Sequence, residues 1–143
     1  MSESLFLAIA LLWAGMLIGV SFIATPVKFV APGLTLQVAL EVGRVTFHLF
    51  SRIEWGLALL LLLASFPGAS RLRVLLAIML VALVAAQAIW LLPALDQRVA
   101  AIVAGNAPPP SHHHWLYAAG EATKLILLVA AAGIALWHLQ WRR

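Results

Sequence analysis

Residues Leu5 to Ala24 read LFLAIALLWAGMLIGVSFIA, a run of 20 positions that contains no charged side chain. The hydrocarbon core of a bilayer is about 30 Å thick, and a helix that rises about 1.5 Å per residue needs about 20 residues to cross it. The run therefore predicts a transmembrane helix at residues 5–24. The prolines that follow, Pro26 and Pro32, are expected to end this helix, because proline has no amide donor and disfavours helix in the residue before it.

The same argument from length predicts three more transmembrane helices, at residues 46–66, 72–92 and 112–139. The purely apolar part of the second, Trp55–Phe66, has only 12 residues and cannot cross a membrane alone. Its helix must therefore begin near Thr46 and carry charged residues at or below the headgroups. Residues 93–104 are expected to form a short amphipathic helix on the membrane surface, and residues 34–44 a similar one that leads into the second helix.

The composition of the whole chain supports this class. Of its 143 residues, 64% are hydrophobic and 10% are charged, whereas about a quarter of the residues in soluble domains are charged. A soluble fold of this composition would expose large apolar patches. We therefore predict an all-α polytopic membrane protein, a four-transmembrane-helix bundle that occupies residues 1–143 as a single domain with short interfacial segments.

The basic residues are scattered singly and in pairs near the predicted helix ends, so the net charge of +4 indicates topology and lipid headgroups rather than nucleic acid. Positive residues concentrate on the cytoplasmic side of membrane proteins. Counting them predicts both termini in the cytoplasm and a place in the cell membrane, which is the inner membrane in a bacterium. The termini side holds Arg71, Arg73, Arg142 and Arg143, against Lys28, Arg44 and Arg98 on the other, with Arg52 ambiguous.

The helix predicted at residues 112–139 carries polar residues inside an apolar segment. His114, Tyr117, Glu121 and Lys124 are spaced by three, four and three residues, so they share one helix face. Glu121 would lie roughly 10–15 Å deep, where a charged group costs several kcal/mol unless it is paired or hydrated. Two interpretations follow: a buried ion pair that holds the bundle together, or a polar cavity between the second and fourth helices that handles a proton, an ion or a polar headgroup.

The second predicted helix opens with charged residues on one stripe, because Glu41, Arg44, His48 and Arg52 are three or four positions apart. Glu54 lies roughly 200° from Arg52 around the helix, so it faces either the bundle interior or the headgroups. The candidate residues for a polar cavity are His48, Glu54, His114, Tyr117, Glu121 and Lys124.

The consecutive residues His112, His113 and His114 raise the hypothesis of a metal site. Neighbouring residues on a helix point about 100° apart, so three in a row cannot all ligate one ion. A metal would need one of them together with His48 or a carboxylate such as Glu54 or Asp96, and His48 with His114 would also suit haem. Interfacial histidines without a cofactor are the simpler interpretation.

The first helix contains Gly15 and Gly19, whose small-xxx-small spacing allows two helices to approach closely. The spacing predicts either packing inside the chain or a dimer face. The expected partners are the lipid bilayer and either further copies of the chain or other membrane subunits. A chain of this size would need a homo-oligomer to build a complete transport path.

Short motifs in all four helices resemble those of small four-helix membrane proteins related to transmembrane protein 205, a family with a domain of unknown function. The resemblance implies four helices in a membrane and no established reaction. It rests on Thr25-Pro26-Val27-Lys28-Phe29, Phe47-His48, Trp90-Leu91-Leu92-Pro93 with Arg98, and His114 with Tyr117. The chain departs from the family pattern in its three consecutive histidines and in Glu121 and Lys124.

The sequence favours a protein that is not an enzyme. It contains no serine–histidine–acid order, phosphate loop or metalloprotease motif, and the absence of cysteine excludes thiol catalysis. The expected function is to bind or help move a small ion or polar solute through the intramembrane cavity. A scaffold subunit of a membrane complex and a haem- or metal-binding membrane protein are the alternatives.

Overall fold

The computed structural model describes residues 2–66, 70–106 and 108–141, and this part of the chain is helical with no strand. Four segments are long and apolar enough to cross a membrane. This confirms the predicted class, an all-α bundle of four membrane-spanning helices. The four spans are Glu3–Val30, Leu36–Ser65, Arg71–Val103 and His113–Gln140.

Two of the four spans are built from several helical segments, and the other two are single α-helices. The first span consists of α1 (Ser2–Leu17), the π-helix η1 (Ile18–Ala24), α2 (Thr25–Val27) and the 3₁₀ turn η2 (Lys28–Val30). The second is α3 (Leu36–Ser65). The third consists of α4 (Arg71–Ala86), the π-helix η3 (Gln87–Leu91) and α5 (Leu92–Val103), and the fourth is α6 (His113–Gln140).

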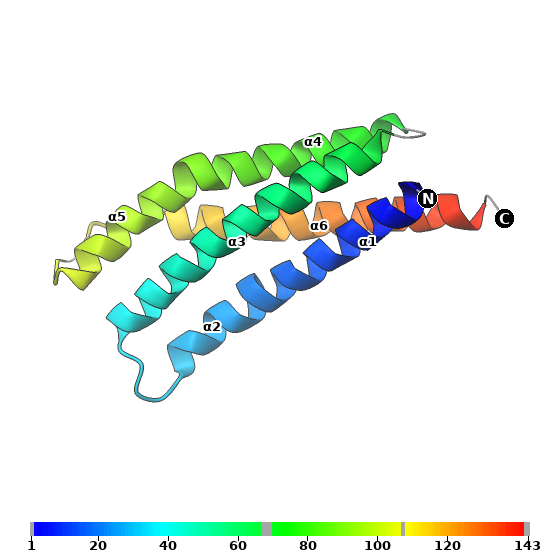
Figure 1. Cartoon of the computed structure of the whole chain (residues 1–143). Helices are drawn as coiled ribbons and strands as arrows, with labels where there is room; N and C mark the ends of the chain where they lie inside the picture. Colours follow the sequence, from blue (N-terminus) through cyan, green and yellow to red (C-terminus); the bar gives the residue numbers. More distant parts are fainter. Residues whose placement is uncertain (1, 67–69, 107, 142–143) are drawn as a thin grey trace.

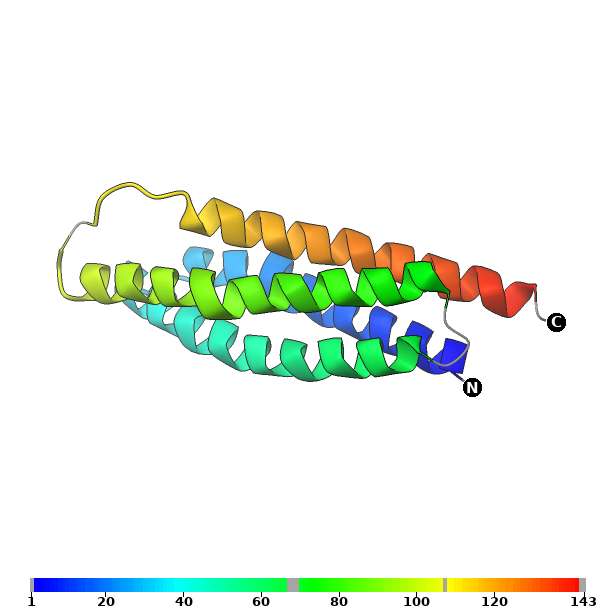
Figure 2. The ribbon, with the colours of Figure 1, turned by 90° about the horizontal axis from the view of Figure 1, so that it is seen from above.

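The spans pack around a common core as a ring. Helix α1 contacts α6 and α3, while α4 contacts the same two helices, so every span has two neighbours (Figure 1). The view from above in Figure 2 shows the long connection from α5 to α6 at the end of the bundle opposite to the two termini. The beginning of α1 and the end of α6 lie at one end; Arg142 and Arg143 lie outside the described residues.

The spans are longer than the sequence indicated. The first continues past Pro26 and ends at Val30, directly before Ala31 and Pro32, so of the two prolines expected to end this helix only Pro32 follows its end. The π-helix η1 ends just before Pro26. Its changed hydrogen-bond pattern accommodates Pro26, which has no backbone N–H to donate to a carbonyl of the preceding turn. The side chain of Thr25 also donates to the carbonyl of Val20 at 2.8 Å.

The prediction of a separate surface helix was wrong for residues 93–104, whereas residues 36–44 lead directly into the second span as expected. Pro93 follows the π turn η3 in the same way as Pro26 follows η1, so residues 93–103 continue the third span as α5. Residues 36–44 are the first turns of α3, which begins after Thr35. The Thr35 side chain accepts a hydrogen bond from the amide of Val38 at 3.3 Å, which is the usual way to cap a helix start.

The core consists of two apolar clusters. The larger one lies toward the termini and includes Phe6, Trp13, Leu61 and Leu128. The smaller one lies at the other end and contains Leu91, Leu92 and Tyr117, with Phe47 and Leu95 packed against it. The outer surface is apolar as well, with side chains such as Leu63, Ile126 and Val129 more than 60% exposed. Such a surface suits contact with lipid.

Candidate functional site

An ionic triad of Glu54, Glu121 and Lys124 is buried between α3 and α6. The Nζ atom of Lys124 lies 2.5 Å from Oε1 of Glu54 and 2.7 Å from Oε1 of Glu121. All three side chains are at most 3% exposed. One ammonium group therefore serves two carboxylates, and Glu54 faces the bundle interior, one of the two orientations that its helical position allowed.

Hydrogen-bond donors from the other two spans complete the triad. Trp13 of α1 donates its indole N–H to Oε1 of Glu54 at 3.0 Å. Gln87 donates its amide to Oε1 of Glu121 at 3.0 Å and to the carbonyl of Tyr117 at 3.2 Å. The hydroxyl of Ser21 donates to Oε2 of Glu121. All four spans therefore meet at the two carboxylates.

Both π-helices carry a residue of this network. Ser21 lies within η1, and Gln87 is the first residue of η3. A π turn accommodates one extra residue and so rotates the residues on one side of it relative to those on the other. Such turns occur frequently at functional sites. Here the wide turns of two different spans both face Glu121.

Gly120 allows the close approach of Gln87 to α6. A Cβ atom added at Gly120 would lie 2.8 Å from Nε2 of Gln87 and 3.3 Å from its Cδ. Any larger residue at this position would force the Gln87 side chain away. The position of the Gln87 amide, which donates to Glu121, therefore requires glycine at position 120, directly before Glu121.

A cavity of about 300 Å³ extends from Glu121 of the triad to His114, in the first turn of α6. Glu121 is the member of the triad that lines it; Glu54 and Lys124 do not. The cavity lies mainly between the first and fourth spans, not between the second and fourth as predicted. Its walls are formed by Ser21, Phe22, Thr25, Pro26, Phe29, Phe47, Leu95, His114, Tyr117, Ala118 and Glu121.

Tyr117 lines this cavity and has an unused hydrogen-bonding group. The side chain is 4% exposed, and its ring packs edge-on against Phe47 with 5.0 Å between centroids. Its hydroxyl has no hydrogen-bond partner within the described chain. Buried hydroxyl groups in proteins are nearly always hydrogen-bonded, so this group is suited to a water molecule or a solute in the cavity.

The structure divides the predicted polar residues into two groups. Glu54, Tyr117, Glu121 and Lys124 come together in the core, and His114 lines the cavity at its outer part. His48 does not belong to this site. It lies on the exposed stripe of α3, where its Nε2 lies 2.7 Å from Oδ2 of Asp96.

The histidines do not converge on a common point. His113 turns toward the ring of Trp90, at 6.3 Å between centroids, while His114 lines the cavity and His48 pairs on the outside. Over residues 2–66, 70–106 and 108–141, no three His, Cys, Asp or Glu side chains are placed to hold a metal ion together. The geometry therefore provides no ligand set for a metal at His48 and His114.

The glycines of the first helix do not mediate close packing within the chain. Gly15 is exposed and Gly19 half-buried, and a Cβ atom added at either would meet no atom within 4 Å. Internal packing is therefore not their role in this structure. The dimer face stays a prediction.

Sequence reasoning missed several residues of the network because their partners are distant in sequence. Trp13, Ser21 and Gln87 each contact a carboxylate 34 to 100 positions away. A signal was present, since Gln87 is the lone uncharged polar side chain in a long apolar run. A second buried pair was also missed: Arg73 Nη1 lies 2.7 Å from Glu3 Oε2 at the termini end of the bundle.

No known protein-family model, curated protein or solved structure matches this chain. The function is therefore inferred from the site.

Proposed function

We propose that this chain is a membrane protein that binds a small cation, in the simplest case a proton, at Glu121 and exchanges it with one membrane face through the cavity. The observation that supports this most directly is the double position of Glu121. Its carboxylate belongs to the buried triad and also forms part of the cavity wall.

The charge of the triad supports cation binding. Two carboxylates and one ammonium carry a net charge of −1 when all three are ionised. An uncompensated charge in an apolar interior is costly, and one bound proton makes the group neutral. Glu121 is the better position for it, because Glu121 lines the cavity and its second oxygen contacts the hydroxyl of Ser21, which can both donate and accept.

The cavity offers polar groups for exchange between Glu121 and the membrane surface. Tyr117 and His114 line it in turn along α6, and His114 is exposed. An imidazole ring has two nitrogen atoms that can take part in hydrogen bonds as donor or acceptor. On the other side of the triad, Trp13, Leu61 and Leu128 are completely buried in the large apolar cluster. A single chain therefore offers access from one face, and a complete path requires a second copy or a partner subunit.

Infrared spectroscopy of the protein in lipid nanodiscs tests this proposal. Wild-type protein at neutral pH should show the C=O stretch of one protonated carboxyl group, which shifts when D₂O exchanges the proton through the cavity. The band should disappear in Glu54→Gln and also in Glu121→Gln, because each variant leaves a neutral pair with Lys124. Glu3→Gln is the control, since Glu3 pairs elsewhere with Arg73. A wild-type spectrum without this band would refute the proposal for a proton.

A scaffold subunit is the second candidate, because the triad and its hydrogen bonds join all four spans. Stability and exchange distinguish the two. If Glu121→Gln strongly destabilises the protein and the wild type has no exchangeable carboxyl proton, the scaffold is the correct function. If the variant stays folded and loses the band, cation binding is supported.

We further propose that the chain belongs to the family related to transmembrane protein 205 and lies in the cell membrane with cytoplasmic termini. Two residues that carry the resemblance, Phe47 and Tyr117, pack against each other at the cavity. Thr35 directly precedes α3 and Ser70 directly precedes α4, at opposite ends of the bundle. Accessibility labelling of cysteines introduced at these two positions would test the orientation.

A further inference from the structure

Lys28, at the end of the first span, presents its ammonium group to apolar and aromatic neighbours. Its Nζ atom lies 5.0 Å from the ring centroid of Phe29 and 5.6 Å from that of Phe47. No carboxylate of the described residues pairs with it. Aromatic faces attract a cation weakly compared with a full counter-ion, so an anion at this position would be bound favourably.

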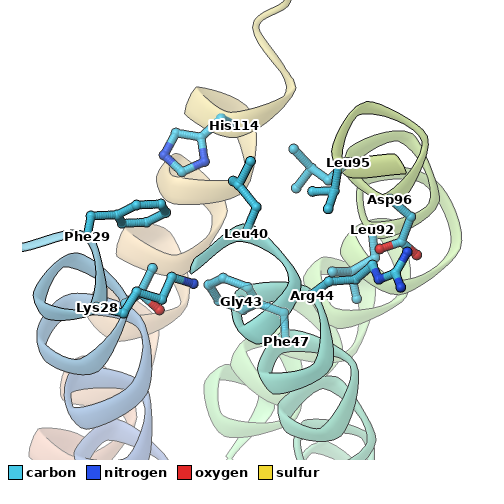
Figure 3. Close-up of a pocket in the computed structure, with 12 residues that line it drawn as sticks. Lys28, Phe29, Leu40, Gly43, Arg44, Phe47, Leu92, Leu95, Asp96 and His114 are labelled. Atoms are coloured by element: carbon cyan, nitrogen blue, oxygen red, sulfur yellow. The ribbon is translucent and has the colours of Figure 1, made fainter. Parts of the chain in front are cut away.

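The backbone of α3 provides space for this ammonium group. A Cβ atom added at Gly43 would overlap Nζ of Lys28, so a larger residue there would require the ammonium group to move. Figure 3 shows the Lys28 side chain extended toward Gly43 across the space between the helices. The present position of the Lys28 ammonium group therefore requires a residue without a side chain at position 43.

Lys28 lines a small cavity that is more basic than acidic. Arg44 and His114 also line it; Arg44 lies 3.9 Å from Glu41, which does not line the cavity, and the one lining carboxylate, Asp96, is bonded to His48. The cavity volume is about 90 Å³. A cavity needs about 10–15 Å³ to hold one water molecule, so this one has room for a group the size of a phosphate. The remaining walls are largely apolar, formed by Phe29, Leu40, Phe47, Leu92, Leu95 and Val99.

We propose that this cavity binds the phosphate group of an anionic membrane lipid, with Lys28 as its counter-ion. The position at the end of a span favours a lipid as the source of the anion, because lysines at span ends meet the headgroups. The lining residue Phe29 and its chain neighbour Val30 are 47% and 77% exposed, so apolar surface for the acyl chains adjoins the site.

This lipid site does not depend on proton binding at Glu121. The two cavities share Thr25, Phe29, Phe47, Leu95 and His114 in their walls, so a bound headgroup would lie at the entrance to the deeper one. The ionic group at the centre of each proposal differs, Lys28 for the lipid and Glu121 for the proton, so each proposal is tested by its own variant.

Native mass spectrometry of the detergent-purified full chain tests the site, with phosphatidylglycerol and phosphatidylcholine as the added lipids. The wild type should retain one phosphatidylglycerol in preference to phosphatidylcholine. Lys28→Gln should weaken this retention about fivefold, the usual effect of one basic residue on an anionic lipid. Gly43→Ala should do the same, because the added methyl group displaces the ammonium. Gly56→Ala on the same helix is the matched control, since its Cβ would meet no atom within 4 Å, and it should bind like the wild type.

Three results would overturn the proposal. The first is equal retention of phosphatidylglycerol by Lys28→Gln and the wild type. The second is no preference of the wild type for the anionic lipid. The third is binding of inorganic phosphate as tight as that of the lipid, which would assign the site to a free anion. If Gly43→Ala does not fold, Lys28→Gln alone decides between these outcomes.

Discussion

The charge balance of the triad predicts that its two carboxylates are strongly coupled in stability. Replacing Glu54 by Gln leaves an amide oxygen that can still accept from Trp13 and a neutral pair of Lys124 with Glu121. The cost should be about 1 kcal/mol, close to that of one hydrogen bond in a membrane protein. Glu121→Gln leaves the neutral pair of Lys124 with Glu54 and should cost about the same.

The double variant should behave differently from the sum of the single ones. With both carboxylates replaced, Lys124 becomes a buried charge without a counter-ion, and breaking a buried pair in this way costs about 3–5 kcal/mol. The coupling energy should therefore be about 1–3 kcal/mol. Adding Lys124→Met to the double variant should recover most of the loss, because an apolar side chain of similar volume can replace a buried ion pair.

Equilibrium unfolding in lipid bicelles, by steric trapping, measures these free energies for the four variants and the wild type. The same protein preparations allow the helix content of each variant to be checked first. Additive costs for the two glutamines, or no recovery by Lys124→Met, would show that the three groups do not share one charge balance. The reasoning from the triad to cation binding would then fail.

Three further predictions follow from individual contacts. Gly120→Ala should displace Gln87 and lower the proton-exchange rate of the buried carboxyl in infrared measurements, whereas Gly133→Ala on the same helix, where a Cβ meets nothing within 4 Å, should leave it unchanged. Tyr117→Phe should change the unfolding free energy by less than about 1 kcal/mol, because the hydroxyl has no partner to lose among the described residues, while D₂O exchange through the cavity slows; a large loss of stability would indicate a hidden partner. Glu3→Gln should lower the unfolding free energy in bicelles by about 1 kcal/mol, because a neutral amide that can still accept a hydrogen bond replaces the carboxylate beside Arg73, and a loss above about 3 kcal/mol would contradict this.

Hydrophobic length was sufficient to predict the four spans, because the requirement of a bilayer for about 20 apolar helical residues is strict. The joint position of Tyr117, Glu121 and Lys124 was also predictable, since their spacing is local to one helix. The position of Glu54 was left open, because a helical wheel shows that it leaves the Arg52 stripe but not which element it meets.

The remaining features depend on tertiary structure that short-range patterns do not contain. Pro26 and Pro93 were expected to end helices or to separate segments, and the π turns that accommodate them are visible only in the folded chain. His48 was placed in the cavity on its residue type, although its stripe faces outward and its partner Asp96 is 48 positions away. Trp13 and Ser21 have no distinguishing neighbours in sequence, so their contacts with the carboxylates could not be inferred.

The two π turns separate the bundle into a half near the termini and a half around the cavities. Toward the termini, the helices are regular and their side chains interlock in the large apolar cluster. Beyond Ser21 and Gln87, the first and third spans continue as short segments past Pro26 and Pro93, around two cavities. Bending at these points need not disturb the interlocked half, because each proline has already removed one backbone hydrogen bond from the helix. Ligand binding in either cavity, as proposed, would therefore involve the end of the bundle beyond the π turns and leave the packed half near the termini unchanged.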